Sequence, residues 1–300
     1  MSVTNERIFI IGGTGNVGER TVKAIAAKKV PITVLSRDPS KAQSTFSSID
    51  ASLLTVVKGG YDDLDTLKQV FPGHTRLFLL INHALGRMVQ VKGAIARLAF
   101  ASGIKQIVDL SSSGFGIPLY DNYLLTQHTL AEQAILDAAA DHDDDRYVVL
   151  LRPTRFMTNL VTYYRPGLND FEDTLDPDEK QSWISPNDIA GVAAYVLTDA
   201  MANHATSAYE LTSQVITPTE RAAILSRVLG RSYTYRQISP ADYFSTLSQS
   251  LANYLPIRCI YDIATMVEHT PHVSRGISIF LGREPETLEA FLTANKHLLP

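Results

Sequence analysis

A strand, a glycine turn and a helix follow one another near the start of the chain, and this arrangement restricts the possible folds most strongly. Residues 8–11 are all apolar, which suits a buried parallel strand. Four of the 17 glycines then fall between Gly12 and Gly18, and a helical pattern follows directly. Their spacing satisfies both GxGxxG and GxxGxxG. In this context we predict a dinucleotide site, because glycines allow a pyrophosphate to approach the backbone and a helix amino-terminus attracts anions. A tight turn without a ligand is the alternative.

The distribution of charge also favours an anionic ligand at this end of the chain. Residues 1–60 contain eight lysines and arginines and four acidic residues, whereas the whole chain has a net charge of -4. A basic segment in an otherwise acidic protein indicates where a small anion would bind. The overall acidity argues against a nucleic-acid partner.

A second apolar run at residues 32–35 ends in Ser36 and Arg37, about twenty residues after the glycine turn. NAD-dependent proteins keep an acidic residue at this place for the ribose 2'-hydroxyl. A hydroxyl followed by a guanidinium suits a 2'-phosphate instead, and Lys41 adds positive charge one helical turn later. We therefore predict NADP(H) as the cofactor. In the alternative interpretation Arg37 and Lys41 are solvated, and Asp38 is the ribose ligand.

Apolar runs and helical patterns alternate along the first half of the chain. This alternation predicts an α/β fold, a Rossmann-like doubly wound parallel sheet with helices on both faces. The further strand-like runs lie at residues 54–57, 76–81, 106–110 and 147–151, and the helical patterns between them include 89–101 and 129–140.

The pattern loosens after residue 152, and three segments there combine a Ser or Thr, a proline and an acidic residue. These are the features of a capped helix start, so we predict helices from Pro186, Pro218 and Pro240, the second of them ending at Gly230. We predict two domains: an NAD(P)-binding Rossmann domain at residues 1–155, and a smaller, mostly helical substrate-binding region at residues 156–300.

Composition excludes several classes of protein. The chain has 300 residues, of which 45% are apolar, so it buries enough surface to fold without disulfides. Its single cysteine, Cys259, makes no internal bridge and indicates a reducing compartment. No apolar run is long enough for a membrane span, and the first residues lack a secretion signal. We expect a cytoplasmic monomer or homodimer with a small-molecule substrate and no membrane partner.

Three side chains are candidates for chemistry. Short-chain dehydrogenases use a Ser, a Tyr and a Lys four residues after the Tyr. Here Ser111 ends the fifth strand and Tyr123 follows twelve residues later, but Gln127 occupies the lysine position. A neutral amide supplies no positive charge, so a packed aromatic is an equal interpretation of Tyr123. His128 serves either as an acid or base near neutral pH or as the cap of the helix that follows.

Motifs for other chemistries are absent from the sequence. It contains no GxSxG, HExxH or CxxC, so hydrolase and zinc functions have no motif to support them. The acidic loop at residues 141–145 is interpreted as solvated, and we predict no metal site.

Several segments together resemble the NmrA-like group of atypical short-chain dehydrogenases, most closely the branch of ergot-alkaloid dehydrogenases and NAD(P)H:quinone reductases. The similarity covers roughly residues 5–235, and its narrowest motif is Arg-Pro-Thr-x-Phe-Met-x-Asn. The segments that carry it are, in order, residues 12–18, 36–37, 111–113, 151–159, 188–190 and 225–230.

The resemblance implies that the diphosphate lies at residues 14–17 and the nicotinamide near the ends of the fourth to sixth strands. Members often have an Asp after the third strand for the adenine, but Gly60 stands there, with Tyr61 or Asp62 beside it. Many members have a Pro at the fourth strand tip, which here reads Asn-His. With the residues found above, the predicted cofactor-binding set is Gly12, Thr14, Gly15, Asn16, Val17, Gly18, Ser36, Arg37, Lys41, Tyr61, Ile81, Asn82, Ser111, Pro153 and Phe156.

The missing lysine also bears on the substrate. A simple ketone needs a proton for its developing alkoxide, whereas an iminium ion does not, and quinones and enones form delocalised anions. We therefore predict an NADPH-dependent oxidoreductase that transfers hydride to an iminium, a quinone or a conjugated carbonyl, in a setting such as secondary metabolism. The alternatives are an NADP(H)-binding redox sensor without turnover, and a non-redox enzyme such as an isomerase or cyclase.

Overall fold

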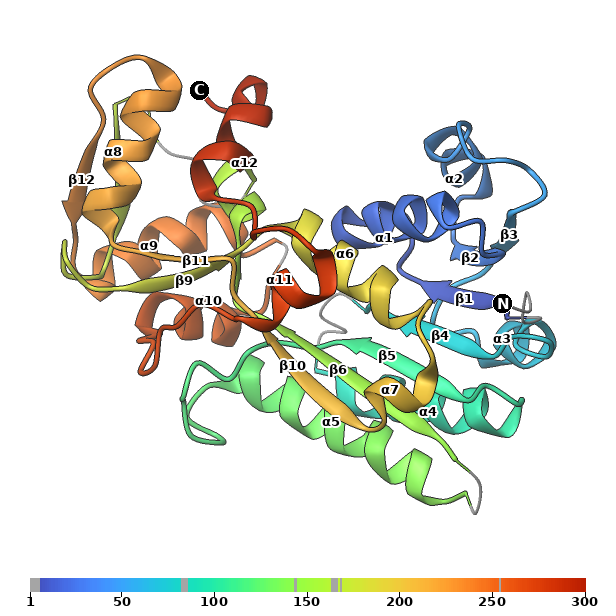
Figure 1. The fold of residues 1–300 in the computed structure, drawn as a ribbon. Helices are drawn as coiled ribbons and strands as arrows, with labels where there is room; N and C mark the ends of the chain where they lie inside the picture. Colours follow the sequence, from blue (N-terminus) through green and yellow to red (C-terminus); the bar gives the residue numbers. More distant parts are fainter. Residues whose placement is uncertain (1–5, 82–85, 143–144, 163–166, 168, 254) are drawn as a thin grey trace. The chain divides into compact units, whose positions relative to one another are not determined.

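The computed structural model contains two compact units, and each is built from separate stretches of the chain (Figure 1). The first unit comprises Met1–Ser112, Gln127–Arg152 and Ile189–Tyr209. The second comprises Ser113–Thr126, Pro153–Asp188 and Glu210–Pro300. The structure describes residues 6–81, 86–142, 145–162, 167, 169–253 and 255–300. The division into domains at residues 155 and 156 stays a prediction.

A seven-stranded sheet, which is centred on the first unit, confirms the predicted doubly wound fold. Its order is β10-β6-β5-β4-β1-β2-β3, and β1 pairs in parallel with both β2 and β4 (Figure 1). The pairs β2–β3, β4–β5 and β5–β6 are also parallel. The strands are β1 (Ile8–Ile11), β2 (Ile32–Ser36), β3 (Leu54–Lys58), β4 (Arg76–Leu79), β5 (Gln106–Leu110), β6 (Tyr147–Pro153) and β10 (Ser207–Leu211).

The direction of winding reverses between β1 and β4, which is the position where open α/β sheets bind ligands at their carboxyl edge. Helices cover both faces of the sheet, with α4 and α5 on one and α1 and most of α6 on the other (Figure 1). The helices are α1 (Asn16–Ala27), α2 (Pro39–Thr45), α3 (Leu64–Val70), α4 (Met88–Ala101), α5 (Tyr123–Ala140), α6 (Pro186–Val196) and α7 (Met201–His204).

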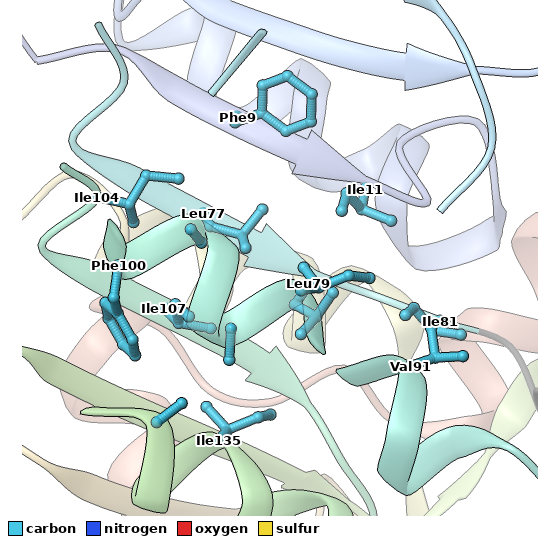
Figure 2. Close-up of a cluster of buried hydrophobic side chains, with 14 of the residues drawn as sticks. Phe9, Ile11, Leu77, Leu79, Ile81, Val91, Phe100, Ile104, Ile107 and Ile135 are labelled. Atoms are coloured by element: carbon cyan, nitrogen blue, oxygen red, sulfur yellow. The ribbon is translucent and has the colours of Figure 1, made fainter. Parts of the chain in front are cut away.

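The main core of the first unit lies between the sheet and the α4 and α5 face (Figure 2). Leu77 and Ile107 of the sheet pack in one cluster with Phe100 of α4 and Ile135 of α5, and all four are fully or almost fully buried. Each such side chain contributes about 1.5–3 kcal/mol to folding relative to an exposed one. This core fixes the strand ends from which the candidate site is built.

The start of α5 differs from the sequence-based expectation, which placed it near residue 128. The helix begins at Tyr123, because the side chain of Asn122 accepts a hydrogen bond from the amide of Leu125 at 3.0 Å and Asp262 accepts one from the amide of Leu124 at 3.0 Å. These two side chains satisfy the first-turn donors. His128 therefore lies inside the helix, and its interpretation as a helix cap is wrong.

The second unit contains two small sheets, β11-β9-β7 and β12-β8, and most of its remaining regular structure is helical. Helices begin at Pro186, Pro218 and Pro240 as predicted, and Gly230 ends α8 in a left-handed conformation with φ 73°. The elements are β7 (Arg155–Phe156), β8 (Asp170–Asp173), β9 (Gln181–Ile184), β11 (Gln214–Ile216), β12 (Thr234–Gln237), α8 (Pro218–Leu229), α9 (Pro240–Leu251), α10 (Ile257–Thr265), α11 (Gly276–Leu281) and α12 (Leu288–Ala294), with 3-10 turns at Met157–Val161 and Lys296–Leu298.

A buried carboxylate ties the C-terminal segment into the second unit. Asp188 is fully buried and accepts hydrogen bonds from the Ser213 hydroxyl at 2.6 Å, the Arg283 guanidinium at 2.7 Å and the Glu286 amide at 2.8 Å. These contacts meet the cost of burying its charge. In the described part of the chain, no helix is long and apolar enough to cross a membrane.

Candidate nucleotide site

The glycine turn between β1 and α1 is packed so tightly that two of its positions require glycine. Gly12 has a φ of 83°, and a Cβ there would lie 2.3 Å from the carbonyl oxygen of Leu80. A Cβ on Gly18 would lie 2.1 Å from the carbonyl oxygen of Gly12. Distances below 3.0 Å to backbone atoms are not relieved by side-chain motion. The turn thus brings the first turn of α1 directly against the end of β1.

The amino-terminus of α1 faces this turn with no side chain of its own as a cap. Gly15 is the N-cap residue and forms no side-chain hydrogen bond, and Asn16 and Val17 begin the helix. Backbone N–H groups in a first helical turn have no partner within the helix, and the helix dipole adds partial positive charge. Val17 is buried, so its side chain serves the core, whereas Thr14 is partly exposed and Asn16 is exposed. This geometry is suited to an anion such as a diphosphate.

Arg20 adds a contact that the sequence did not reveal. Its guanidinium donates to the backbone carbonyl and to the side-chain oxygen of Asn16, both at 2.7 Å. The spacing of four residues on a helix was the only available signal, because it places both side chains on one face. Arg20 therefore brings positive charge to the first turn of α1 and fixes the orientation of the Asn16 side chain.

Three neighbouring residues at the tip of β2 make different contacts, and these contacts bear on their predicted roles. The Ser36 hydroxyl donates to the carbonyl of Asp38 at 2.8 Å and accepts from its amide at 3.2 Å, so it is occupied in shaping the loop. The Asp38 carboxylate accepts from the amide of Lys41 at 3.0 Å and caps α2. Arg37 is exposed, and within the described part of the chain its guanidinium forms no hydrogen bond or ion pair. The cap contact counts against Asp38 as the ribose ligand. Arg37 and Lys41 are both exposed at this tip, where a ligand can reach them.

The tips of β3 and β4 lie at the same edge of the sheet, as parallel pairing requires. Tyr61 is partly buried and packs against the main core cluster. Asp63 accepts hydrogen bonds from Thr66 that cap α3 and lower the pKa of its carboxyl group. Ile81 is 5% exposed and belongs to the core cluster, so its side chain serves the core (Figure 2). Asn82, the other residue predicted here, lies outside the described residues.

Ser111 directly follows β5 and carries an unsatisfied polar atom. Its amide donates to the carbonyl of Leu151 at 2.8 Å, which continues the ladder between β5 and β6. The side chain is 5% exposed, and its Oγ has no hydrogen-bond partner within the described residues. A buried hydroxyl without a partner costs free energy unless a ligand or water supplies one. This position therefore fits a cofactor or substrate atom.

The remaining predicted residues fall on α5 and in the second unit. Tyr123 is the first residue of α5, and Gln127 and His128 follow in the same helix, with His128 buried. In the second unit, Pro153 accepts a hydrogen bond from the amide of Ser113 at 2.9 Å, and Phe156 of β7 lies opposite Ile184 of β9. Among the described residues, no group of three or more potential ligand side chains gathers to hold a metal ion.

Sequence reasoning also missed a buried ion pair directly before Ser111. Lys92 of α4 and Asp109 of β5 are both fully buried and lie 2.8 Å apart. The available signal was a charged residue inside a buried strand, which requires a compensating partner. The lysine itself gave no signal, because a helical pattern accommodates exposed lysines equally well.

Sheet order and glycine turn together define a Rossmann-like protein whose carboxyl edge is suited to a dinucleotide. The chain belongs to the NmrA-like family, whose model matches residues 4–292. This confirms the family to which the sequence motifs pointed.

The chain is similar to named reductases of this kind. It is 28% identical over 234 residues to (4-alkanoyl-5-oxo-2,5-dihydrofuran-3-yl)methyl phosphate reductase of Streptomyces griseus, with 77% of each chain covered. It is 28% identical over 244 residues to festuclavine dehydrogenase of Aspergillus fumigatus, with 78% of each covered. The structure of the NADPH-dependent quinone oxidoreductase QOR2 of Escherichia coli, complexed with NADPH, superimposes with a TM-score of 0.77 at 24% identity over 97% of this chain and 99% of that one. Both the ergot-alkaloid and the quinone-reductase members of the predicted branch are thus represented.

Proposed function

We propose that this chain is an NADPH-dependent oxidoreductase that delivers hydride to a small organic acceptor. The observation that carries the proposal is the pairing of the glycine turn with the exposed guanidinium of Arg37 at the tip of β2. The names of the relatives support a reductase, since one is a reductase, one a dehydrogenase and one an NADPH-dependent oxidoreductase.

In this proposal the diphosphate is bound mainly by backbone groups. The N–H groups of the first turn of α1 bind it, and Arg20 adds positive charge. Arg37 binds the 2'-phosphate, with Lys41 contributing a weaker and more screened attraction. Ser36 acts through the shape of its loop, because its hydroxyl already serves Asp38. The residues proposed for the adenine and nicotinamide are those predicted from the sequence: Tyr61, Ile81, Asn82, Ser111, Pro153 and Phe156.

The proposed class of hydride acceptor rests on the absence of a lysine at position 127 of α5. Tyr123 and Gln127 are four residues apart on this helix, but Gln127 carries no charge that would favour a phenolate. NADPH supplies a hydride when bound, and the protein is left to orient the acceptor and exclude water. An iminium needs no proton, and a quinone or conjugated carbonyl forms a delocalised anion that solvent protonates. The Streptomyces relative agrees, because its named substrate is an alkanoyl-substituted oxo-dihydrofuran, which is a conjugated carbonyl.

Replacement of Tyr123 by phenylalanine is expected to change kcat for a conjugated carbonyl or an iminium by less than about threefold, because no proton transfer passes through its hydroxyl. A general acid normally contributes about 100-fold or more. Steady-state rates of NADPH oxidation measure the effect. A loss of about 100-fold would identify Tyr123 as the proton donor and contradict the proposed acceptor class.

A substrate panel tests the proposal itself. NADPH oxidation is followed with quinones, enones and cyclic imines, and with simple ketones as the matched negative set. We expect turnover with the first three and little with the ketones. Tight NADPH binding without turnover on any compound would favour the redox-sensor interpretation, and turnover of simple ketones at equal rates would refute the acceptor class.

A further inference from the structure

Lys92 and Asp109 form a charged pair in the interior of the first unit. Both side chains are fully buried, and the Lys92 ammonium lies 2.8 Å from Oδ1 and 2.9 Å from Oδ2 of Asp109. Burial raises the pKa of the Asp109 carboxyl, the Lys92 ammonium opposes this shift, and the charge of Glu132 adds to it. The pair thus lies in a position where charges are costly.

Stability alone does not account for such a pair. Removing two charges from water costs several kcal/mol per ion, and well-packed apolar residues of similar volume are often as stable or more stable. The pair adjoins the apolar core, since Ile107 and Ile95 from the same strand and helix belong to the main core cluster. The neighbouring groups that the pair holds in place offer another reason for it.

The ammonium also fixes the backbone at the end of β5. Its third contact is the carbonyl oxygen of Leu110, to which it donates at 3.1 Å. Leu110 directly precedes Ser111, whose own amide is held by Leu151 at 2.8 Å. The peptide group between Leu110 and Ser111 is consequently anchored at both ends, its carbonyl by Lys92 of α4 and its amide by Leu151 of β6.

Ser111 continues the alternation of side chains to which Asp109 belongs. Alternate residues of a strand share a face, Ile107 and Asp109 of β5 both face α4, and Ser111 is the next residue in that series. The Ser111 Oγ is buried and lacks a hydrogen-bond partner within the described residues, whereas the neighbouring charges are paired. Glu132 of α5, the next charge facing Asp109, is itself held by Arg152 through two hydrogen bonds of 2.9 and 2.6 Å.

We propose that Lys92 and Asp109 are positioning residues that hold the tip of β5 so that the Ser111 hydroxyl is kept ready for the nicotinamide or the reacting substrate. This inference rests on the proposed function, because it takes Ser111 to lie on the reacting side of the bound nucleotide. It assigns the buried charge pair a role within that function.

A mutant cycle tests whether the pair acts through Ser111. The variants are Ser111→Ala, the apolar double replacement Lys92→Met with Asp109→Leu, and the combination of all three. We expect Ser111→Ala and the double replacement each to lower kcat by about tenfold or more while the Kd of NADPH stays within about twofold. On the Ser111→Ala background, the double replacement should have no further effect on kcat.

A second readout does not depend on turnover. The emission of bound NADPH reports the surroundings of its nicotinamide ring, and the double replacement should shift it in the same direction as Ser111→Ala. Arg76→Met is the matched control, because Arg76 is a buried cation at the opposite edge of the same sheet, bound to Glu6 and Gln106. It should leave both kcat and emission unchanged even if it lowers stability.

The outcomes separate the two proposals. Unchanged kcat and emission in the apolar double variant would show that the pair is only structural, and additive losses in the triple variant would show that it does not act through Ser111. A wild-type protein without turnover would refute the proposed function. The emission measurement does not depend on turnover, so it would still show whether the pair acts through Ser111. If circular dichroism shows that Lys92→Met with Asp109→Leu is unfolded, Lys92→Met with Asp109→Asn takes its place, because asparagine preserves the volume at position 109.

Discussion

Replacement of Arg37 by glutamine is expected to raise the Kd of NADPH by about 10- to 100-fold and to leave the Kd of NADH unchanged. A charge-assisted hydrogen bond to a phosphate contributes about 1.5–3 kcal/mol, and each 1.4 kcal/mol corresponds to a factor of ten in affinity. Arg37 is exposed at the tip of β2, so its removal leaves no buried group unpaired. Fluorescence titration of both nucleotides against wild type and variant measures the change.

Arg7→Gln is the matched control for this experiment. Arg7 is also exposed and precedes β1 at the amino edge of the sheet, where it donates to the Thr55 hydroxyl. Arg7→Gln removes the same charge far from the carboxyl edge. Any change in the Kd of NADPH that comes only from the lower net charge will therefore appear in this variant too. Equal losses in the two variants, or equal wild-type affinity for NADPH and NADH, would show that Arg37 does not select the 2'-phosphate.

Two alanine substitutions in the glycine turn are expected to have different effects, one on stability and the other on NADPH binding. Gly18→Ala should lower the free energy of unfolding by about 2–3 kcal/mol, because its Cβ would lie 2.1 Å from the carbonyl oxygen of Gly12 and the backbone must shift. Gly15→Ala should leave stability almost unchanged, because its Cβ would meet only that oxygen at 3.4 Å and its φ is -86°. It should nevertheless weaken NADPH binding at least tenfold, because the Cβ would occupy the space where a diphosphate approaches.

Thermal unfolding and nucleotide titration on the same two variants distinguish these effects. Gly15 and Gly18 thus serve as controls for each other, since each should change chiefly one of the two measured quantities. Wild-type NADPH affinity in Gly15→Ala would mean that the diphosphate does not approach this turn. Wild-type stability in Gly18→Ala would contradict the tight packing of α1 on the end of β1.

The sequence predicted those elements whose signals lie within a few neighbouring residues. Strands buried on both faces are rich in apolar residues, so β1, β2 and β5 were visible as short segments. Helix starts at Pro218 and Pro240 were visible because the capping residue, the proline and the acid are adjacent in sequence. The glycine turn was visible for the same reason, since its steric requirement is local.

Long-range contacts could not be predicted in this way. The true start of α5 depends on Asp262, which accepts from the amide of Leu124 although it lies 138 residues later. The partner of Asp109 is Lys92 on a different element, and nothing in the helical pattern marks that lysine as buried. Likewise, the sequence alone did not show that the Asp38 carboxylate caps α2 by accepting a hydrogen bond from the amide of Lys41.

Transfer of deuterium from the nicotinamide tests the central claim most directly. NADPH labelled with deuterium at either face of its C4 position is incubated with the protein and an enone or cyclic imine on which the protein turns over, so that the transferred label is retained on carbon. We expect one of the two labelled forms to yield a product that carries deuterium, as mass spectrometry would show. A reduced product without deuterium from both forms, or no reduction of any such acceptor by a protein that binds NADPH, would contradict the account.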